Sequence, residues 1–422
     1  MTGIDALLAR REALLGPGMA TFYRRPLHLE RGEGVWLWDT EGRRYLDCYN
    51  NVPHVGHCHP RVVEAICRQA GTLNTHTRYL HEGILDYVER LTATFAAPLR
   101  AGLLTCTGSE ANDVALRMAQ AATGRTGVIA TDHTYHGNTA AVSQLSTRMP
   151  PIGGFGGHVR HVPAPDSLRD PEDGGAAFGR AVEAAIASLE ESGHGFSALI
   201  LCPYFANEGF PAVPEGYLDA ALAAVRRAGG LFIADEVQPG FGRLGSHFWG
   251  HRRIGAQPDI VTLGKPMGNG HPVGGVVTSP EILAEFRKAF RYFNTFGGNP
   301  VSCAAAMAVL DVMEDEGLMA NAEASGAHAR ARLEAIAASD PRIGNVRGAG
   351  LFFGAEFVHE DGITPDPETC AEVVEGMLAR GVILNRLGLH MNTLKIRPPL
   401  PFGRAEADLL AEALADTLDA LG

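Results

Sequence analysis

Short apolar runs alternate with alanine-rich stretches through the middle of the chain. Seven runs of five residues lie at 102–106, 127–131, 158–162, 198–202, 231–235, 259–263 and 274–278. Stretches with a helical spacing of apolar positions separate several of these runs, at 109–122, 175–192 and 215–228. Mostly apolar strands joined by helices predict a largely parallel sheet with both faces covered, and therefore an α/β fold.

The pattern changes toward both ends of the chain. Residues 1–50 combine a helical stretch with two short alternating runs around a Thr-Glu-Gly turn, which predicts a peripheral arm packed with a smaller domain. From about residue 301, a long alanine-rich helix precedes the strand-like segments GLFFGAEF, VILN and LKIRPPL and a final helix. We therefore expect a large domain over 51–300 and a smaller α+β domain over 301–422.

Composition and charge narrow the class of protein. The 422 residues are 45% hydrophobic and 20% charged, with 36 Lys and Arg against 48 Asp and Glu for a net charge of −12. This acidic balance disfavours binding to nucleic acid or to an anionic membrane, and no apolar run approaches the roughly 18 residues that span a bilayer. Seven scattered cysteines without a CxxC pair, and charges within the first eleven residues, favour a reducing, cytoplasmic location over secretion.

Asp235 and Glu236 follow the apolar run 231–235, at the expected carboxyl end of a buried strand. Open α/β sheets bind ligands at this edge. The same string resembles the acidic strand of an ATPase, but that class needs a glycine-rich loop ending in Gly-Lys-Ser/Thr. Here the single Gly-Lys pair is followed by Pro266, which makes an NTPase improbable.

Lys265 follows the apolar run 259–263 and lies in a loop rich in glycine and proline. Only three of the 36 basic residues are lysines, so arginine supplies nearly every surface cation. A lysine in this loop therefore indicates a task that arginine cannot perform, the loss of its proton to give a nucleophilic amine. An amine that condenses with an aldehyde, near the Asp235 carboxylate that can hold a protonated ring, meets the requirement of pyridoxal phosphate.

Three loop segments supply candidate contacts to such a cofactor. In CTGSEAN a helix begins near Ser109, and its free amides with Gly108 suit a phosphate, although a simple helix cap would explain the same residues. Tyr135, in DHTYHGNT, could stack on a flat ring or only pack in its loop. Thr295, in NTFGGNP, could donate to a phosphate, and its alternative is a turn.

Two further groups have competing interpretations. The histidines of HVGHCHP (54–60) suggest a metal, but they lack helical spacing and a second paired cluster, so we expect no metal site. Arg397, in LKIRPPL, suits bidentate recognition of a carboxylate and would serve equally well in a structural ion pair.

Taken together, the chain resembles the class III pyridoxal-phosphate-dependent aminotransferases of fold type I, from RGEGVWLWDTEGRRYLDC to LKIRPPLPF. The motifs TGSEAN, YHG, DEVQPGFGRLG, LGKPMGNGHPVGG and TFGGNP occur in the family's order. The resemblance implies a seven-stranded, mostly parallel sheet and a homodimer with shared active sites.

The resemblance also implies a role for each candidate residue. Lys265 would form the Schiff base with the cofactor, and Asp235 would pair with the ring nitrogen. Cofactor contacts would come from Gly108, Ser109, Tyr135 and Gln238, with Thr295 reaching the phosphate bound by the partner subunit. Arg397 matches the family's binder of the substrate carboxylate, so the expected reaction moves an amino group from a donor to a 2-oxo acid.

Two features depart from the commonest pattern of that family. Cys202 occupies the position of a glutamate that often faces the carboxylate-binding arginine. The segments NNVPHVGHCHP and THTRYLHEGILDYVERL resemble a branch that includes the ethanolamine-phosphate and phosphohydroxylysine phospho-lyases. Elimination of phosphate and ammonia from a phosphorylated amino alcohol is therefore the alternative activity. Arg78 in this segment is an anion-binding candidate whose other interpretation is a surface ion pair.

Overall fold

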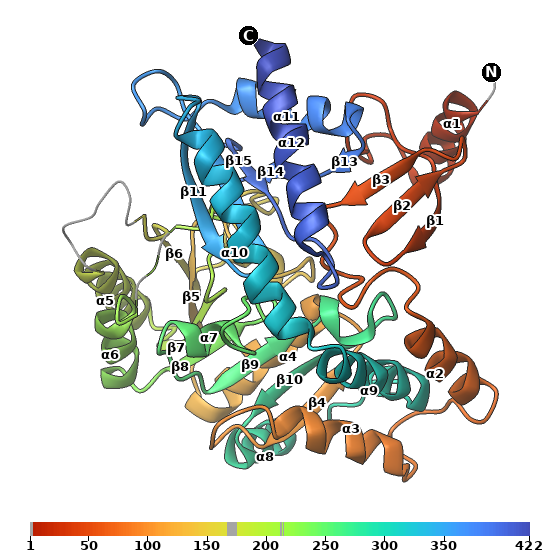
Figure 1. Cartoon of the computed structure of the whole chain (residues 1–422). Helices are drawn as coiled ribbons and strands as arrows, with labels where there is room; N and C mark the ends of the chain where they lie inside the picture. Colours follow the sequence, from red (N-terminus) through yellow and green to blue (C-terminus); the bar gives the residue numbers. More distant parts are fainter. Residues whose placement is uncertain (1–2, 167–174, 212, 214) are drawn as a thin grey trace.

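The computed structural model describes residues 3–166, 175–211, 213 and 215–422. Its centre is a seven-stranded sheet with the strand order β4-β10-β9-β8-β7-β5-β6 (Figure 1). The strands are β4 (Ala101–Thr105), β5 (Gly127–Thr131), β6 (Val159–Val162), β7 (Phe196–Leu201), β8 (Leu231–Asp235), β9 (Ile260–Leu263) and β10 (Gly274–Thr278). Neighbours from β6 to β9 pair in parallel, and β10 is antiparallel to both of its neighbours. The predicted mostly parallel sheet is confirmed.

Helices cover both faces of this sheet, which explains why its central strands are apolar throughout. Along β7, Leu199 and Leu201 belong to one hydrophobic core and Ile200 to the other, because alternate side chains leave opposite faces of a strand. On one side α5 (Ala176–Glu191) packs with α6 (Asp219–Arg227), and on the other α4 (Gly108–Thr123) packs with α8 (Pro280–Ala289).

Two smaller sheets lie outside the large one, and the first of them joins the beginning of the chain to its end. The first contains β1 (Leu29–Glu33), β2 (Trp36–Asp39), β3 (Arg44–Asp47) and β13 (Val382–Ile383), with β13 parallel to β3. The second contains β11 (Ile343–Ala349), β12 (Phe352–Phe357), β15 (Thr393–Lys395) and β14 (Asn385–Leu387). Strand β11 is absent from the prediction because its sequence, IGNVRGA, has no apolar run, and antiparallel pairing to β12 forms it.

The single long helix expected after residue 301 is in fact two helices. Helix α9 (Pro300–Asp315) ends before Gly317. Gly317 has a φ of 60°, which breaks the helix, and α10 (Leu318–Ala337) starts after it. Helix α9 packs on α2 (Pro60–Ala70) and α3 (Glu82–Thr92).

The remaining helices lie at the periphery and in the connections. They are α1 (Ile4–Leu15), α7 (Gly250–Arg253), α11 (Pro367–Ala379), α12 (Arg404–Leu421) and the short turns η1 (Val142–Leu145) and η2 (Lys265–Gly268). Helices α10, α11 and α12 gather near the C-terminal end, across from the N-terminal strands (Figure 1). Among the described residues, none of these helices has the length and apolar character needed to cross a membrane.

Candidate active site

The predicted site residues converge where the carboxyl ends of β8 and β9 meet the start of α4. Asp235 ends β8, and Lys265 begins η2 directly after β9. A cavity of about 120 Å³ brings together six of the predicted residues: Gly108, Ser109, Tyr135, Asp235, Gln238 and Lys265. The parallel pairing of β8 with β9 explains this placement, since it sets the ends of both strands at one edge of the sheet.

Three glycines allow the surrounding loops to approach the start of α4. A Cβ on Gly108 would lie 2.9 Å from Val237 Cγ2, and a Cβ on Gly264 would lie 3.2 Å from the Gly108 backbone. Gly137 has φ +140°, and a Cβ there would lie 2.5 Å from Ser109 Oγ. Any side chain at these positions would push the loops away from the cavity.

Thr107 rather than Ser109 caps helix α4, because Thr107 Oγ1 accepts the Glu110 amide at 3.1 Å. Within the described part of the chain, the Ser109 hydroxyl accepts one long hydrogen bond, from the Asn138 amide at 3.3 Å, and it lines the cavity. Ser109 and the helix start therefore remain available to an anion.

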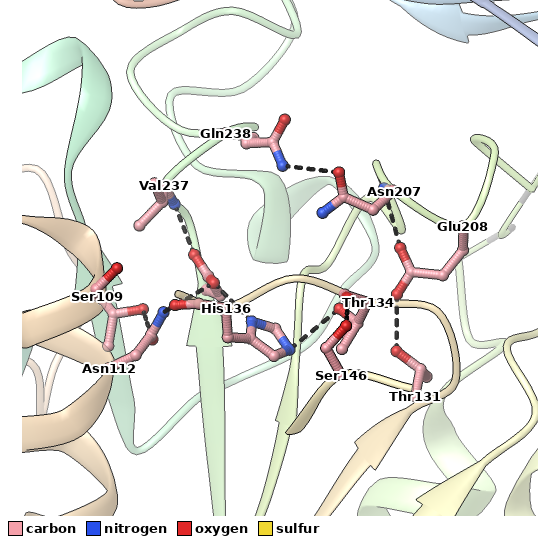
Figure 2. Close-up of polar contacts among 12 residues, drawn as sticks. Ser109, Asn112, Thr131, Thr134, His136, Ser146, Asn207, Glu208, Val237 and Gln238 are labelled. Carbon is pink, nitrogen blue, oxygen red and sulfur yellow. Dashed lines mark hydrogen bonds and ion pairs between the residues drawn. The ribbon is translucent and has the colours of Figure 1, made fainter. Parts of the chain in front are cut away.

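A buried network fixes the carboxylate of Asp235. Its Oδ2 accepts from Asn112 Nδ2 at 3.0 Å and lies 2.6 Å from His136 Nδ1, while its Oδ1 accepts from the Val237 amide at 3.0 Å (Figure 2). The Thr262 hydroxyl donates to Asn112 Oδ1 at 2.6 Å, which orients the amide so that its nitrogen faces Asp235. Asp235 is thus held in one orientation at the wall of the cavity.

Lys265 has the character expected of a nucleophilic amine. Burial and the positive charge of Arg397 together lower its pKa to about 8, against the opposing attraction of Asp235. At pH 7 roughly a tenth of this amine is therefore unprotonated, far more than for a lysine with its ordinary pKa.

A second cavity of about 370 Å³ lies next to the first. Four residues line both cavities: Tyr135, Gly137, Gln238 and Lys265. The described lining of the second cavity contains Arg148, Lys395 and Arg397 and no carboxylate. Arg148 and Arg397 therefore make this part of the site positive.

Gln238 binds the two buried cations of the second cavity. Its Oε1 accepts from Arg397 NH1 at 2.6 Å and from Lys395 Nζ at 3.1 Å. Burial lowers the pKa of Lys395 well below its ordinary value, and the charges of Arg397 and Lys265 act in the same direction. The predicted contact from Gln238 to a cofactor oxygen stays a prediction.

Arg397 is held by neutral partners. Its Nε donates to the Tyr49 carbonyl at 2.8 Å, and its guanidinium lies 4.6 Å from the centre of the Tyr49 ring. Across the described ranges it forms no ion pair with a carboxylate, which disfavours the structural ion pair considered above and leaves its charge directed at the cavity.

Thr295 and Arg78 lie outside both cavities. Thr295 is exposed. The Arg78 guanidinium lies 3.8 Å from the centre of the Phe293 ring, and it forms no ion pair with a described residue. Cys202 lines the smaller cavity, and burial raises the pKa of its thiol, so this side chain is neutral.

The histidines of the 54–60 segment each contact protein groups. His54 Nε2 lies 2.7 Å from the Phe241 carbonyl, His57 Nε2 lies 2.7 Å from Asp47, and His59 Nε2 lies 3.0 Å from Glu316. Over the part of the chain that the structure describes, no three His, Cys, Asp or Glu side chains gather as a metal site.

Asn112, His136 and Lys395 are site residues that sequence reasoning missed. Asn112 belongs to TGSEAN and His136 to YHG, but neither motif reveals that both side chains reach Asp235, which is more than 95 residues away along the chain. The sequence did contain a hint for Lys395, because it is one of only three lysines and the scarcity of lysine had already drawn attention to Lys265.

The residues present fit pyridoxal phosphate. Asp235 has a fixed carboxylate for a protonated ring nitrogen, Lys265 has an amine with a lowered pKa, and Ser109 at the start of α4 suits the phosphate. Tyr135 lines the same cavity. A seven-stranded sheet with this site at its strand ends defines an α/β enzyme of fold type I.

Comparisons with known proteins identify the family. The model of the class-III aminotransferases matches residues 20–418, so the chain belongs to that family, whose members use pyridoxal phosphate. A solved phospholyase from Arthrobacter, in complex with phosphoethanolamine, is 48% identical, with a TM-score of 0.95 over 99% of this chain and all of its own.

Curated relatives carry the names of two activities. An alanine–glyoxylate aminotransferase 2-like protein of Drosophila melanogaster is 41% identical, over 94% of this chain and 84% of its own length. An ethanolamine-phosphate phospho-lyase homolog of Caenorhabditis elegans is 36% identical, over 94% of this chain and 90% of its own. The chain is a class III pyridoxal-phosphate-dependent enzyme related to proteins of both kinds.

Proposed function

We propose that this enzyme is a phospho-lyase that eliminates phosphate and ammonia from a phosphorylated amino alcohol. The observation that carries this proposal is the positive cavity beside Lys265, in which Lys395, Arg397 and Arg148 meet no described carboxylate. Two arginines, with the Lys395 amine that a bound dianion would favour in its protonated form, suit a phosphate better than the single charge of a carboxylate. This reverses the order of the two activities expected from the sequence.

Each residue then has a defined task. Bound pyridoxal phosphate supplies an aldehyde that condenses with the substrate amine and a ring that withdraws electrons from the adjacent carbon. Lys265, once its amine is free, removes the proton from that carbon. Lys395 and Arg397 hold the substrate phosphate and stabilise its negative charge as the carbon–oxygen bond breaks. With one water consumed, phosphoethanolamine gives acetaldehyde, ammonia and inorganic phosphate.

The Arthrobacter phospholyase was solved with phosphoethanolamine bound, which supports a short phosphorylated amine as the substrate of this chain. The neutral thiol at Cys202 adds a second argument. A glutamate there would place a negative charge in the smaller cavity, next to the cavity that receives the phosphate.

Transamination is the second candidate, favoured by the orientation of Arg397. Its guanidinium is fixed by Tyr49 and Gln238 and could bind the carboxylate of an amino or oxo acid. The Drosophila relative bears an aminotransferase name.

One experiment separates the two activities. The purified holoenzyme is incubated with phosphoethanolamine, and phosphate, ammonia and aldehyde are measured with and without an oxo acid. We expect equal amounts of the three products without any oxo acid, and none from ethanolamine, which lacks the leaving group. Turnover of L-alanine that requires glyoxylate, without phosphate release from phosphorylated amines, would instead establish transamination.

The active form is proposed to be a homodimer in which Thr295 completes the partner's site. Thr295 is exposed and absent from the cavities of its own chain, and Phe296 beside it is 70% exposed. A cytoplasmic location is proposed from the seven free cysteines, which suit a reducing compartment.

A further inference from the structure

Asn207 lies in the loop after β7 and lines the cavity of about 370 Å³ together with Lys395 and Arg397. The residue is only 8% exposed. Its side-chain nitrogen Nδ2 is buried and has no hydrogen-bond partner among the described residues. A buried donor of this kind costs free energy in the folded protein unless an acceptor is supplied from elsewhere.

The orientation of the Asn207 amide follows from its neighbours. Arg397 NH1 can only donate, so the Gln238 atom that it contacts at 2.6 Å is the oxygen Oε1. The other end of the Gln238 amide is the nitrogen Nε2, which donates to Asn207 Oδ1 at 3.5 Å (Figure 2). Lys395 Nζ lies 3.5 Å from the same oxygen. Turning the Asn207 amide over would set its nitrogen against these two nitrogens, so Nδ2 is the atom left without a partner.

The acceptor for Asn207 Nδ2 has to come from a ligand. The described lining of the cavity contains arginine and lysine side chains but no carboxylate. The two polar atoms of one amide are close neighbours, so a group bound beside Lys395 lies within reach of Asn207 Nδ2. A phosphate group has several acceptor oxygens and can accept from both side chains at once.

The position of Asn207 favours the substrate over the cofactor. The residues that suit the cofactor phosphate and ring nitrogen, Ser109 and Asp235, line the smaller of the two cavities and not the larger one. Asn207 lines the larger cavity and not the smaller one, whereas Lys265 lines both. A ligand group beside Asn207 is therefore on the substrate's side of Lys265.

We propose that Asn207 is a specificity-determining residue whose amide nitrogen donates a hydrogen bond to the phosphate group of the substrate, beside Lys395. The inference rests on the proposed function, because it takes the substrate phosphate to lie in the larger cavity. The amide distinguishes an amine that carries a phosphate from one that lacks it, because only the former satisfies the buried donor.

The test measures binding to the holoenzyme, with 2-aminoethylphosphonate as the probe. A carbon–phosphorus bond in this probe replaces the carbon–oxygen bond that elimination breaks, so no phosphate is released. Ethanolamine is the matched ligand without the phosphorus group. The change in the visible spectrum of the bound cofactor on mixing gives both dissociation constants, and the wild type should bind the probe at least about tenfold more tightly.

Asn207→Leu removes the donor and keeps a side chain of similar size. It should weaken the binding of the probe by about tenfold to hundredfold and leave that of ethanolamine unchanged, since one hydrogen bond to a charged group is lost. The melting temperature should change by less than about 3 °C, because the fold does not use this donor and the contacts of Oδ1 are long. Asn207→Asp keeps the shape but turns a carboxylate toward the probe, and it should weaken binding at least as much.

Ser143→Ala is the control on the wall of the same cavity. The Ser143 hydroxyl donates to the Ala140 carbonyl at 3.3 Å, so its proton is already used within the protein. This variant should bind the probe and ethanolamine as the wild type does. If Asn207→Leu fails to fold, Asn207→Asp tests the same donor.

The outcomes separate the inference from the proposed function. Equal binding of the probe and ethanolamine by the wild type would overturn the phosphate site on which both depend. A wild type that prefers the probe, with Asn207 variants that keep this preference, would overturn the inference alone. A loss of affinity for both ligands, or for pyridoxal phosphate, would also overturn it, because it would assign Asn207 to the cofactor.

Discussion

Lys265 and Lys395 are two amines at one cavity, and burial lowers the pKa of both. For Lys265 this is useful, because an unprotonated amine is the reactive form. For Lys395 it is a cost, since a phosphate is bound by the protonated form. The two lysines therefore respond to pH and to mutation in different ways.

The rate at which the cofactor-free protein takes up pyridoxal phosphate should rise between pH 7 and 9, with a midpoint near 8. Only the unprotonated Lys265 amine attacks the aldehyde, and its pKa is about 8. Arg397→Gln should move this midpoint upward, because the charge of Arg397 lowers the pKa of Lys265. The visible absorption that develops on uptake measures the rate.

Lys265→Ala is the control for that experiment and should develop no such absorption. A rate that does not change across this pH range would contradict the assignment of Lys265 as the attacking group.

Lys395→Met should stabilise the folded protein at pH 7 by roughly 1–3 kcal/mol. The pKa of Lys395 lies below its ordinary value in the folded state, so the unfolded chain binds the proton more readily and the buried charge destabilises the fold. The gain should shrink as the pH rises toward 10, where the unfolded chain also loses this proton. Thermal unfolding at pH 7 and 9.5 measures both effects.

The same variant should lose about tenfold to hundredfold of its activity on phosphoethanolamine, since one charged hydrogen bond to the phosphate is removed. Lys288→Met is the matched control, because Lys288 is an exposed side chain on α8, paired with Glu285. It should change neither stability nor activity appreciably. Full activity in Lys395→Met would exclude Lys395 from phosphate binding.

At the scale of elements, the site depends on how closely the loop after β5 approaches the start of α4. Of the three glycines at the site, Gly137 lies closest to its neighbour, because a Cβ there would be 2.5 Å from Ser109 Oγ. Its φ of +140° suits only glycine. The position of this loop therefore determines whether Ser109 and the free amides of α4 can meet a phosphate.

Gly137→Ala should weaken the binding of pyridoxal phosphate by at least about tenfold, because 1.4 kcal/mol of strain at the contact suffices for that factor. Gly153→Ala is the matched control, since Gly153 also has positive φ (+90°) but faces open space. Equilibrium titration of cofactor-free protein measures both constants. Equal affinities in the two variants would show that the contact between residue 137 and Ser109 does not control cofactor binding.

The sequence predicts elements better than the contacts between them. All seven strands of the large sheet follow from their apolar runs, whereas β11 does not, because pairing to β12 and not its own sequence makes it a strand. Asp235 and Lys265 could be predicted because each follows a strand in a recognisable motif. The contact between His136 and Asp235 could not, since it joins segments that are far apart along the chain.

At the scale of the whole molecule, Arg243 connects the loop after β8 to the C-terminal region. Its NH1 donates to the carbonyls of Leu351 at 3.1 Å and Pro398 at 2.7 Å, and its NH2 lies 3.1 Å from His54 Nδ1. Burial lowers the pKa of this guanidinium to about 9. The charge is retained at neutral pH and joins three parts of the chain that are far apart in sequence.

Arg243→Met should destabilise the protein by roughly 2–4 kcal/mol, because two buried carbonyls lose their donor. Arg226→Met, which removes an exposed partner of Asp259, should cost less than about 1 kcal/mol. Denaturant unfolding of both variants measures the difference. Similar costs would mean that the carbonyls find other donors when Arg243 is absent.

Residues 76–80 and 293–296 form an aromatic patch that a second copy of the chain could cover. His76 stacks on Tyr79 and contacts Phe293 edge-on, while Leu80 is fully exposed. Large apolar side chains that remain exposed together are typical of an interface.

Leu80→Glu should weaken the proposed dimer, because a charge would be buried at the interface. Analytical ultracentrifugation over a range of concentrations measures the association. Ile363→Glu is the control, since Ile363 is 66% exposed in a turn outside the patch. Undiminished association in Leu80→Glu would place the interface elsewhere.

The scarcity of lysine has a practical consequence. Two of the three lysines line the cavity, so Lys288 on α8 is the one lysine that an amine-reactive dye or resin reaches from bulk water. Apart from the chain terminus, immobilisation through amines would attach every molecule at α8 in a single orientation. Labelling at 265 and 395 would then report, by mass spectrometry, whether small molecules occupy the interior.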